Sequence, residues 1–161
     1  MKKRMKGFTL VELIVVIAII GVLAAILVPS MMGYVKGSRL KTANSNAKLV
    51  FTTASNVAAE METKGTPLAP GGGEIKCSNT YASSGSISED LSKAVVAALS
   101  DNGDAAGAAY VIIGSDGNVE LSQWRKASTD NMVGQYPDPI DDVKDMPAEP
   151  SWGAKITKSS T

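Results

Sequence analysis

Histidine is absent from the 161 residues, and cysteine occurs once, at Cys77. Without histidine the chain cannot build a Ser-His-Asp or Cys-His nucleophile, or a metal site with imidazole ligands. A single cysteine cannot form a disulfide within these residues. The sequence therefore predicts a protein that is not an enzyme and uses no cofactor. An anchored enzyme that relies on carboxylates alone is the remaining catalytic alternative.

Neither a phosphate-binding loop nor a nucleic-acid-binding patch is evident. Gly71-Gly72-Gly73 is followed by Glu74 rather than by a lysine and a hydroxyl residue. The formal net charge of zero hides an asymmetry, because residues 2–6 hold four basic residues while residues 101–150 hold ten acidic residues against three basic ones. No specific nucleic-acid binding is expected. The asymmetry instead predicts a basic N-terminus in the cytoplasm and an acidic body outside.

Residues 8–32 form a long apolar run with one acidic residue, Glu12, at its front edge. As a helix these 25 residues would span about 37 Å, enough to cross a hydrocarbon core of roughly 30 Å. No cleavage site with small residues follows Val28, so we expect the run to stay on the protein. A carboxylate inside a bilayer costs roughly 2.5–3.5 kcal/mol, so Glu12 calls for an explanation.

The helical pattern continues beyond Pro29 and becomes amphipathic over residues 33–64. Apolar residues recur at spacings of three and four, which predicts a helix with one buried face. They are Leu40, Ala43, Ala47, Val50, Ala54, Val57 and Met61. Gly65-Thr66-Pro67 predicts the end of the helix. The whole helix is thus expected over residues 8–64, with residues 8–32 crossing the membrane.

Residues 65–161 are expected to form a head that covers the amphipathic face, which makes the fold α+β. Residues 66–86 are rich in Pro, Gly and Ser and predict a loop. Ser86 to Glu89 has the spacing of a capping box ahead of a short helix over residues 91–99. Residues 109–113 and 118–124 predict a β-hairpin around a Gly-Ser-Asp-Gly turn. Residues 132–136 and, more weakly, 152–156 are further strand candidates.

The residues Gly7-Phe8-Thr9-Leu10-Val11-Glu12, behind a basic leader and ahead of an apolar helix, resemble a type IV prepilin with a class III-type leader. The resemblance covers about the first quarter of the chain. It implies a pilin-like fold, with one long helix packed on a small antiparallel sheet. It also implies that residues 1–7 are a leader, removed between Gly7 and Phe8 by a prepilin peptidase that then N-methylates Phe8.

The resemblance assigns roles to residues in the helix. Cleavage gives Phe8 a cationic amine, and Glu12, with Thr9 beside it, is implied to guide assembly by pairing with that amine on a neighbouring subunit. A half-made ion pair in an apolar setting is costly, so this pairing favours subunits that are cut and correctly staggered. Gly21 and Pro29 weaken the helix between them, and in pili of this family that segment can lose helicity.

The function implied is a structural subunit that polymerises with itself into a pilus for adhesion, motility or DNA uptake. Membrane lipid holds the precursor in the cytoplasmic membrane, and an assembly platform with its ATPase extrudes the filament. The alternative from the same superfamily is a major pseudopilin of a type II secretion or competence system. An alternative from another class is a membrane-tethered carbohydrate-binding module that uses exposed Trp124 or Trp152.

Three further features of residues 33–161 concern the packing of the C-terminal segment, a group of cations on the helix and a group of carboxylates. Many pilins staple a C-terminal loop with two cysteines, whereas here we expect packing through Trp152 and Tyr136 to hold that segment. The cationic residues Lys36, Arg39, Lys41 and Lys48 form either a solvated face or a surface that pairs with the acidic half of a neighbour. Carboxylates in the C-terminal segment are weak candidates for Ca²⁺ binding, against a solvated acidic loop. They are Asp138, Asp141, Asp142 and Asp145.

Overall fold

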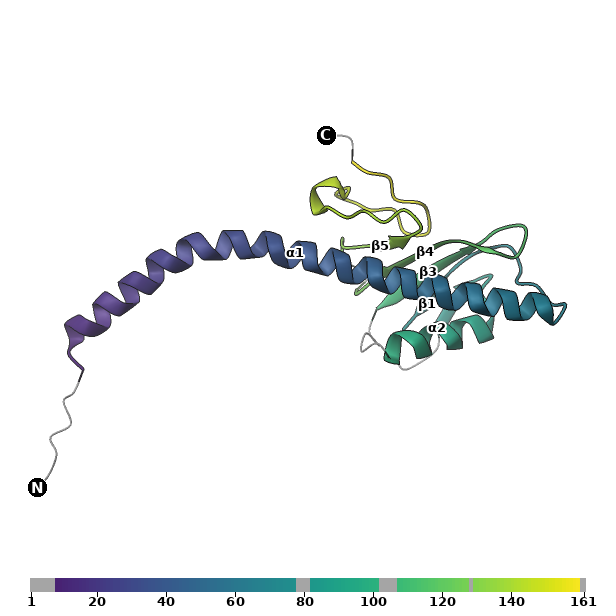
Figure 1. The fold of residues 1–161 in the computed structure, drawn as a ribbon, viewed down its shortest axis with the longest axis horizontal. Helices are drawn as coiled ribbons and strands as arrows, with labels where there is room; N and C mark the ends of the chain where they lie inside the picture. The colour runs from purple at the N-terminus through teal and green to yellow at the C-terminus, as the bar shows by residue number, and fades with distance from the viewer. Residues whose placement is uncertain (1–7, 78–81, 102–106, 128, 160–161) are drawn as a thin grey trace, which may run out of the picture. The chain divides into compact units, whose positions relative to one another are not determined.

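The computed structural model describes residues 8–77, 82–101, 107–127 and 129–159 (Figure 1). The chain divides into two compact units, residues 1–35 and residues 36–161, which we describe separately. The predicted leader, residues 1–7, lies outside the described residues. The first unit therefore consists of the N-terminal part of helix α1, whose full extent is Leu10–Thr63.

Helix α1 begins and ends within two residues of its predicted limits and continues without interruption through Gly21 and Pro29. In residues 36–63 one stripe of the helix is buried, and most of its members are small residues. They are Leu40, Ala43, Asn46, Ala47, Val50, Ala54 and Ala58. The predicted Val57 and Met61 are only half-buried, because a seven-residue spacing drifts by about 20° per repeat around a straight helix.

A five-stranded antiparallel sheet forms the centre of the second unit, in the order β2-β1-β3-β4-β5. The strands are β1 (Gly71–Lys76), β2 (Ala82–Gly85), β3 (Ala108–Ile113), β4 (Val119–Arg125) and β5 (Gly134–Tyr136). Helix α2 (Glu89–Asp101) and the second part of α1 share a core with alternate residues of the sheet, among them Ile75, Ala109 and Val111. The predicted α+β fold, with a long helix packed on a small antiparallel sheet, is confirmed.

The predicted hairpin and third strand are also confirmed. β3 pairs with β4 around the expected turn, where the backbone N–H of Asn118 donates to Asp116 Oδ1 at 3.0 Å. This hydrogen bonding, and above all that from the Asn118 side chain, lowers the pKa of the Asp116 carboxyl. β5 lies within residues 132–136 and pairs with β4.

The prediction of a loop over residues 66–86 is wrong for β1 and β2. The glycines of β1 read as loop residues, but neighbouring atoms leave no room for larger side chains. A Cβ on Gly72 would lie 3.0 Å from the ring of Tyr110, and a Cβ on Gly85, whose φ is +88°, would overlap the carbonyl oxygen of Gly72. Strand pairing on both edges of β1 outweighs the low strand propensity of glycine.

The predicted capping box at the start of α2 is wrong by two residues. The helix begins at Glu89, and the hydroxyl of Ser88 accepts a hydrogen bond from the backbone N–H of Leu91 at 3.3 Å. Ser88 is therefore the capping residue, and Leu91 occupies the position that a capping box gives to Glu or Gln. Ile87, which precedes the cap, lies in the core.

Four side chains form a row across the sheet on the face opposite the helices. Glu74, Tyr110, Gln123 and Gln135 are direct register partners on β1, β3, β4 and β5. Direct partners on antiparallel strands project to the same face, so the four side chains line up perpendicular to the strands. We call them the polar row. Gln123 and Gln135 are fully buried or nearly so, with 0% and 1% of their surfaces exposed.

The C-terminal segment, residues 137–159, lies on the polar row. Gln123 Nε2 donates to the carbonyls of Ser151 and Ala154, and Gln123 Oε1 accepts from the N–H of Gly153 at 2.7 Å. The segment contains the 3₁₀ turn η1 (Val143–Asp145) but no strand among its described residues. The weak strand prediction for residues 152–156 is therefore wrong, because side-chain amides replace the backbone ladder there.

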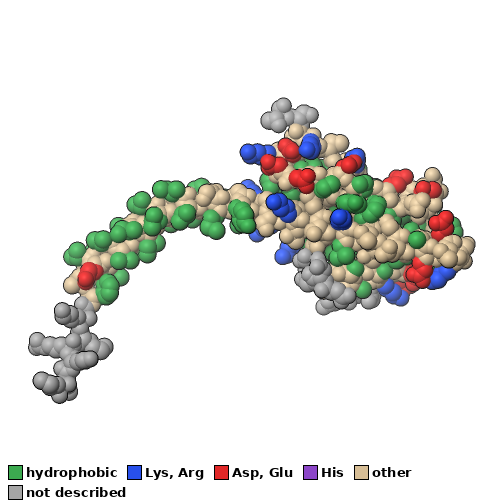
Figure 2. Space-filling view, viewed as in Figure 1, with side chains coloured by type: hydrophobic (Ala, Val, Ile, Leu, Met, Phe, Trp, Pro, Cys, Tyr) green, Lys and Arg blue, Asp and Glu red, His purple; other side chains and the backbone are tan. Residues whose placement is uncertain are grey.

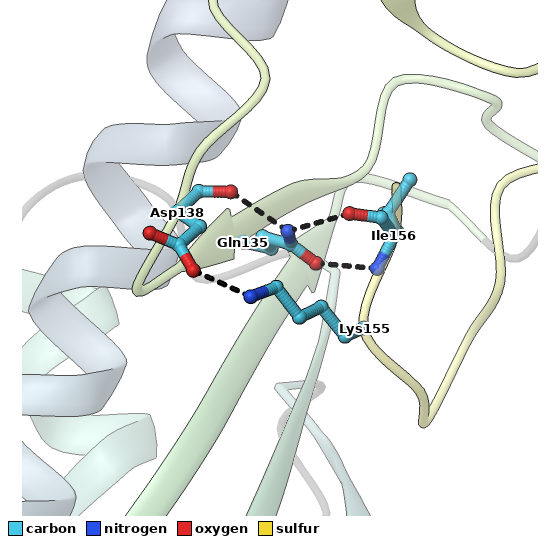
Figure 3. Close-up of polar contacts among 4 residues, drawn as sticks. All are labelled: Gln135, Asp138, Lys155 and Ile156. Atoms are coloured by element: carbon cyan, nitrogen blue, oxygen red, sulfur yellow. Dashed lines mark hydrogen bonds and ion pairs between the residues drawn. The ribbon is translucent and has the colours of Figure 1, made fainter. Parts of the chain in front are cut away.

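Gln135 anchors the end of the same segment (Figure 3). Its Nε2 donates to the carbonyls of Asp138 at 2.7 Å and Ile156 at 2.9 Å, and its Oε1 accepts from the N–H of Ile156 at 2.7 Å. An ion pair between Lys155 and Asp138 closes the arrangement on the solvent side. Ile156 and Ile140 complete a second small core with Leu40 and Val133.

We expect Gln135→Leu to lower the free energy of unfolding by about 2–4 kcal/mol. The substitution leaves the carbonyl of Asp138 and the buried carbonyl and N–H of Ile156 without hydrogen-bond partners. The measurement is urea unfolding of the full chain in detergent, followed by tryptophan fluorescence. Asn131→Ala is the matched control, because it removes an exposed hydrogen bond from the side-chain amide of Asn131 to the carbonyl of Ala148. This loss should cost under about 1 kcal/mol of unfolding free energy. Equal losses for both variants would contradict a special role for the buried amide.

Candidate functional site

The first described turn of α1 is a capping box formed by Thr9 and Glu12. The backbone N–H and the hydroxyl of Thr9 donate to Glu12 Oε2 at 2.8 and 2.6 Å, and the N–H of Glu12 donates back to Thr9 Oγ1 at 3.3 Å. Thr9 caps the helix, and Glu12 occupies its third position. The sequence Thr9-Leu10-Val11-Glu12 has the T-x-x-E spacing of a capping box, but the apolar residues on both sides of Glu12 drew attention to its charge instead.

This capping box explains how a carboxylate is held at the front of an apolar helix. Thr9 meets part of the hydrogen-bonding need of Glu12, and the N-terminal end of the helix favours a negative charge. An ionised carboxylate has about four acceptor positions, so Oε1 remains able to accept from another donor. Phe8 directly precedes the box and is 80% exposed. Gly7, the predicted cleavage partner of Phe8, lies outside the described residues.

Large apolar side chains cover the part of α1 that follows Glu12, and they are exposed (Figure 2). This stretch is long and apolar enough to cross a membrane, and none of its most apolar window is buried within the described chain. Gly21 and Pro29 both lie inside the helix, and Ser30 Oγ donates to the carbonyl of Leu27 at 2.9 Å. The predicted loss of helicity between Gly21 and Pro29 is a property of the assembled state and stays a prediction.

The two tryptophans of the head serve its internal packing. Trp124 is 3% exposed and belongs to the main core. Trp152 donates from Nε1 to Glu74 Oε2 at 2.8 Å, and the guanidinium of Arg125 lies 3.9 Å from its ring centroid. Neither indole is an open platform for stacking a sugar, which argues against the tethered carbohydrate-binding module.

The expected packing of the C-terminal segment is confirmed for Trp152. Tyr110 contacts its ring edge-on, with the ring centroids 5.8 Å apart. Tyr136 packs elsewhere, against Phe51 of α1. Cys77 is 1% exposed, and burial raises the pKa of its thiol to about 11, so it is a structural residue rather than a reactive one.

Three of the four candidate aspartates for Ca²⁺ have separate partners. Asp138 pairs with Lys155, Asp145 lies 3.6 Å from Lys158, and Asp142 accepts from the N–H of Lys144 to cap η1. Across the residues that the structure describes, no group of three or more metal-binding side chains is brought together.

A pocket that the sequence did not predict lies between α1 and the chain that follows β4. Its cavity volume is about 480 Å³. Its lining includes Arg39, Thr42 and Ala43 from α1, and Trp124, Lys126 and Met132 from β4 and the connection to β5. We call it the basic pocket. Its one acidic lining residue, Asp130, accepts a hydrogen bond from the N–H of Met132 at 3.0 Å.

Comparison with known proteins finds a matching family model for the N-terminal part of the chain and relatives that match part of it. The model of the prokaryotic N-terminal methylation motif matches residues 2–28. The type IV major pilin protein PilA of Myxococcus xanthus (strain DK1622) is 39% identical over 59 residues, which cover 37% of this chain and 27% of that protein. A fimbrial protein of Pseudomonas aeruginosa is 41% identical over 58 residues, 36% of this chain and 38% of that protein.

The matches to these relatives cover only part of the chain. The chain spans only about a quarter to two fifths of the length of these two relatives. The type II secretion system core protein G of Dickeya chrysanthemi is 58% identical over a shorter stretch of 33 residues, 20% of this chain. No solved structure gives a significant match. The chain therefore carries the prokaryotic N-terminal methylation motif and is similar, over little more than a third of its length, to type IV pilins.

Proposed function

We propose that the chain is a structural pilin subunit, made as a membrane precursor and polymerised into a type IV pilus. The observation that carries the proposal is the methylation motif, matched over residues 2–28, which includes the start of an apolar helix whose large side chains are exposed among the described residues. Lipid covers these side chains in the precursor, and neighbouring helices cover them in the filament. Transfer from lipid to a helix bundle keeps the apolar surface away from water throughout.

A prepilin peptidase cuts between Gly7 and Phe8 and methylates the new amine. The leader with its four basic residues stays on the cytoplasmic side, and the head lies outside. The amine of Phe8 then lies beside the capping box, and Glu12 forms an ion pair with the Phe8 amine of the next subunit. An assembly platform and its ATPase supply the work of extrusion. The pilus then acts in adhesion, motility or DNA uptake.

The test is the mass of the intact protein and of its N-terminal peptide in filaments sheared from the native cell surface. We expect the sheared protein to begin at methylated Phe8 and to lack residues 1–7. The membrane fraction of the same cells is the control, since it should hold precursor and cut subunits. If residues 1–7 remain attached to the sheared protein, the proposal is wrong.

The second candidate is a major pseudopilin, favoured by the relative from the type II secretion system. A pseudopilin undergoes the same processing but stays within the cell envelope. Finding the cut protein in the envelope fraction, with none in the sheared fraction, would therefore favour the pseudopilin. The same experiment separates the two candidates.

A further inference from the structure

The second unit, residues 36–161, carries two exposed groups of opposite charge without ionic partners among the described residues. The first consists of the two cations of the basic pocket, Arg39 and Lys126. The second is the pair Asp141 and Asp142 in the C-terminal segment, which we call the acidic pair. Most other carboxylates of that segment are engaged, because Asp138 pairs with Lys155 and Asp145 with Lys158.

The two groups belong to opposite flanks of the same stretch of α1. Asn44 faces the C-terminal segment, because its Nδ2 donates to the carbonyl of Ile140 at 2.8 Å and its Oδ1 accepts from the N–H of Gln135. Thr42 lines the basic pocket. Successive residues of an α-helix are about 100° apart, so Thr42 and Asn44 project about 200° apart. Thr42 and Asn44 therefore project to opposite sides of α1, while Met132, which also lines the pocket, packs against the second small core that contains Ile140.

The acidic pair follows Ile140 directly, and no ion pair joins it to the cations of the pocket among the described residues of the same subunit. A second copy, turned so that its C-terminal segment meets the pocket flank, brings opposite charges together. Such a contact joins two different surfaces, and contacts of this heterologous kind repeat into rings or open helical filaments. In a symmetric dimer the same contact would form twice between two copies and would end there, whereas a filament needs the repeating form.

We propose that the acidic pair of one subunit docks into the basic pocket of the next and sets the lateral contact between heads in the filament. This inference rests on the proposed function and adds to it the surfaces by which the heads meet. Exposed ion pairs contribute little individually and are screened by salt. In a filament the contact recurs at every subunit, so it selects the stagger that all subunits share.

The first test is charge reversal in the full chain, expressed in the native cell. We expect Lys126→Glu to lower the amount of subunit in the sheared fraction by about tenfold, since attraction becomes repulsion at every contact. Asp141→Lys should have the same effect, and the two changes combined should restore most of the yield. Lys64→Glu is the matched control, because it reverses an exposed lysine that follows the end of α1, about 37 Å along the helix from Arg39. Equal amounts of processed subunit in the membranes show that the variants fold.

The second test is cross-linking of sheared filaments. Subunits carrying both Lys126→Cys and Asp141→Cys should give a ladder of dimers, trimers and larger products on oxidation. Cys77 is buried and does not compete. Lys64→Cys with Asp141→Cys should give no ladder. Cross-linking in the Lys126→Cys variant alone would reveal a symmetric contact and overturn the inference.

The outcomes distinguish the docking of the acidic pair from the proposed pilin function. If wild-type subunits are absent from the sheared fraction, both proposals are wrong. If wild-type filaments form but the reversals are silent and no ladder appears, only the docking of the acidic pair is wrong. Loss of yield in Lys126→Glu without rescue by Asp141→Lys also overturns it, because the lysine would then act on another partner.

Discussion

Glu12→Gln is expected to remove the subunit from sheared filaments almost completely while leaving cleavage at Gly7 intact. Glutamine can accept from Thr9 as glutamate does, so the start of α1 is preserved. It cannot form an ion pair with the amine of Phe8 on a neighbour. That amine then enters an apolar bundle without a counter-charge, and an uncompensated buried charge costs about 3–5 kcal/mol. At every subunit, such a cost is enough to prevent growth of the filament.

Glu12→Ala is the companion variant, since it removes the capping interaction as well as the charge. The measurement is the amount and the N-terminal mass of subunit in the sheared and membrane fractions of each strain. Loss in both variants assigns the effect to the charge. Assembly of Glu12→Gln at the wild-type level, with loss only in Glu12→Ala, would show that Glu12 serves the helix start and that the pairing mechanism is wrong.

Gly134→Ala is expected to be the most destabilising single substitution in the head. A Cβ on Gly134 would overlap the main-chain carbonyl of Ala43 and the nitrogen of Asn44. These are backbone atoms of α1, so no side-chain rotation can relieve the overlap. The bonds of Asn44 to Gln135 and Ile140 hold the helix at this distance. We expect a loss of about 3 kcal/mol or more in unfolding free energy, the upper end of overpacking effects.

Urea unfolding of the full chain in detergent, followed by tryptophan fluorescence, measures this effect because both tryptophans belong to the head. Gly37→Ala is the control. It adds the same methyl group to α1, where no atom lies within 4 Å, and should raise stability by about 0.5–1 kcal/mol. A Gly134→Ala midpoint equal to that of the wild type would refute the close approach of α1 to β5.

The long helix and the hairpin could be predicted because each depends on a local pattern. The stripe from Leu40 to Met61 repeats with the period of a helix, and the strands around Asp116 carry apolar residues on either side of a turn. β1 could not be predicted, because its glycines are explained by the ring of Tyr110 and by the tight approach of Gly85, both distant in sequence.

The residues of the candidate sites also differ in whether the sequence alone could predict them. Phe8, Thr9 and Glu12 stand within one short motif, so the sequence alone was enough to select them as candidates, and their roles in processing and assembly stay predictions. The basic pocket joins Arg39 to Lys126, which only the packing of β4 against α1 brings together. No pattern in the sequence marks Gln123 and Gln135 as the buried anchors of the C-terminal segment. Their burial depends on the C-terminal segment, which carries no periodic pattern of its own.

The polar row has a consequence for where this head can mature. The amides of Gln123 and Gln135 hold the C-terminal segment by hydrogen bonds that no reductant can break. The head therefore closes without an oxidase or a disulfide isomerase, and thiol reagents that open stapled loops leave it unchanged. A filament built from such heads keeps its surface intact in reducing, oxygen-free surroundings.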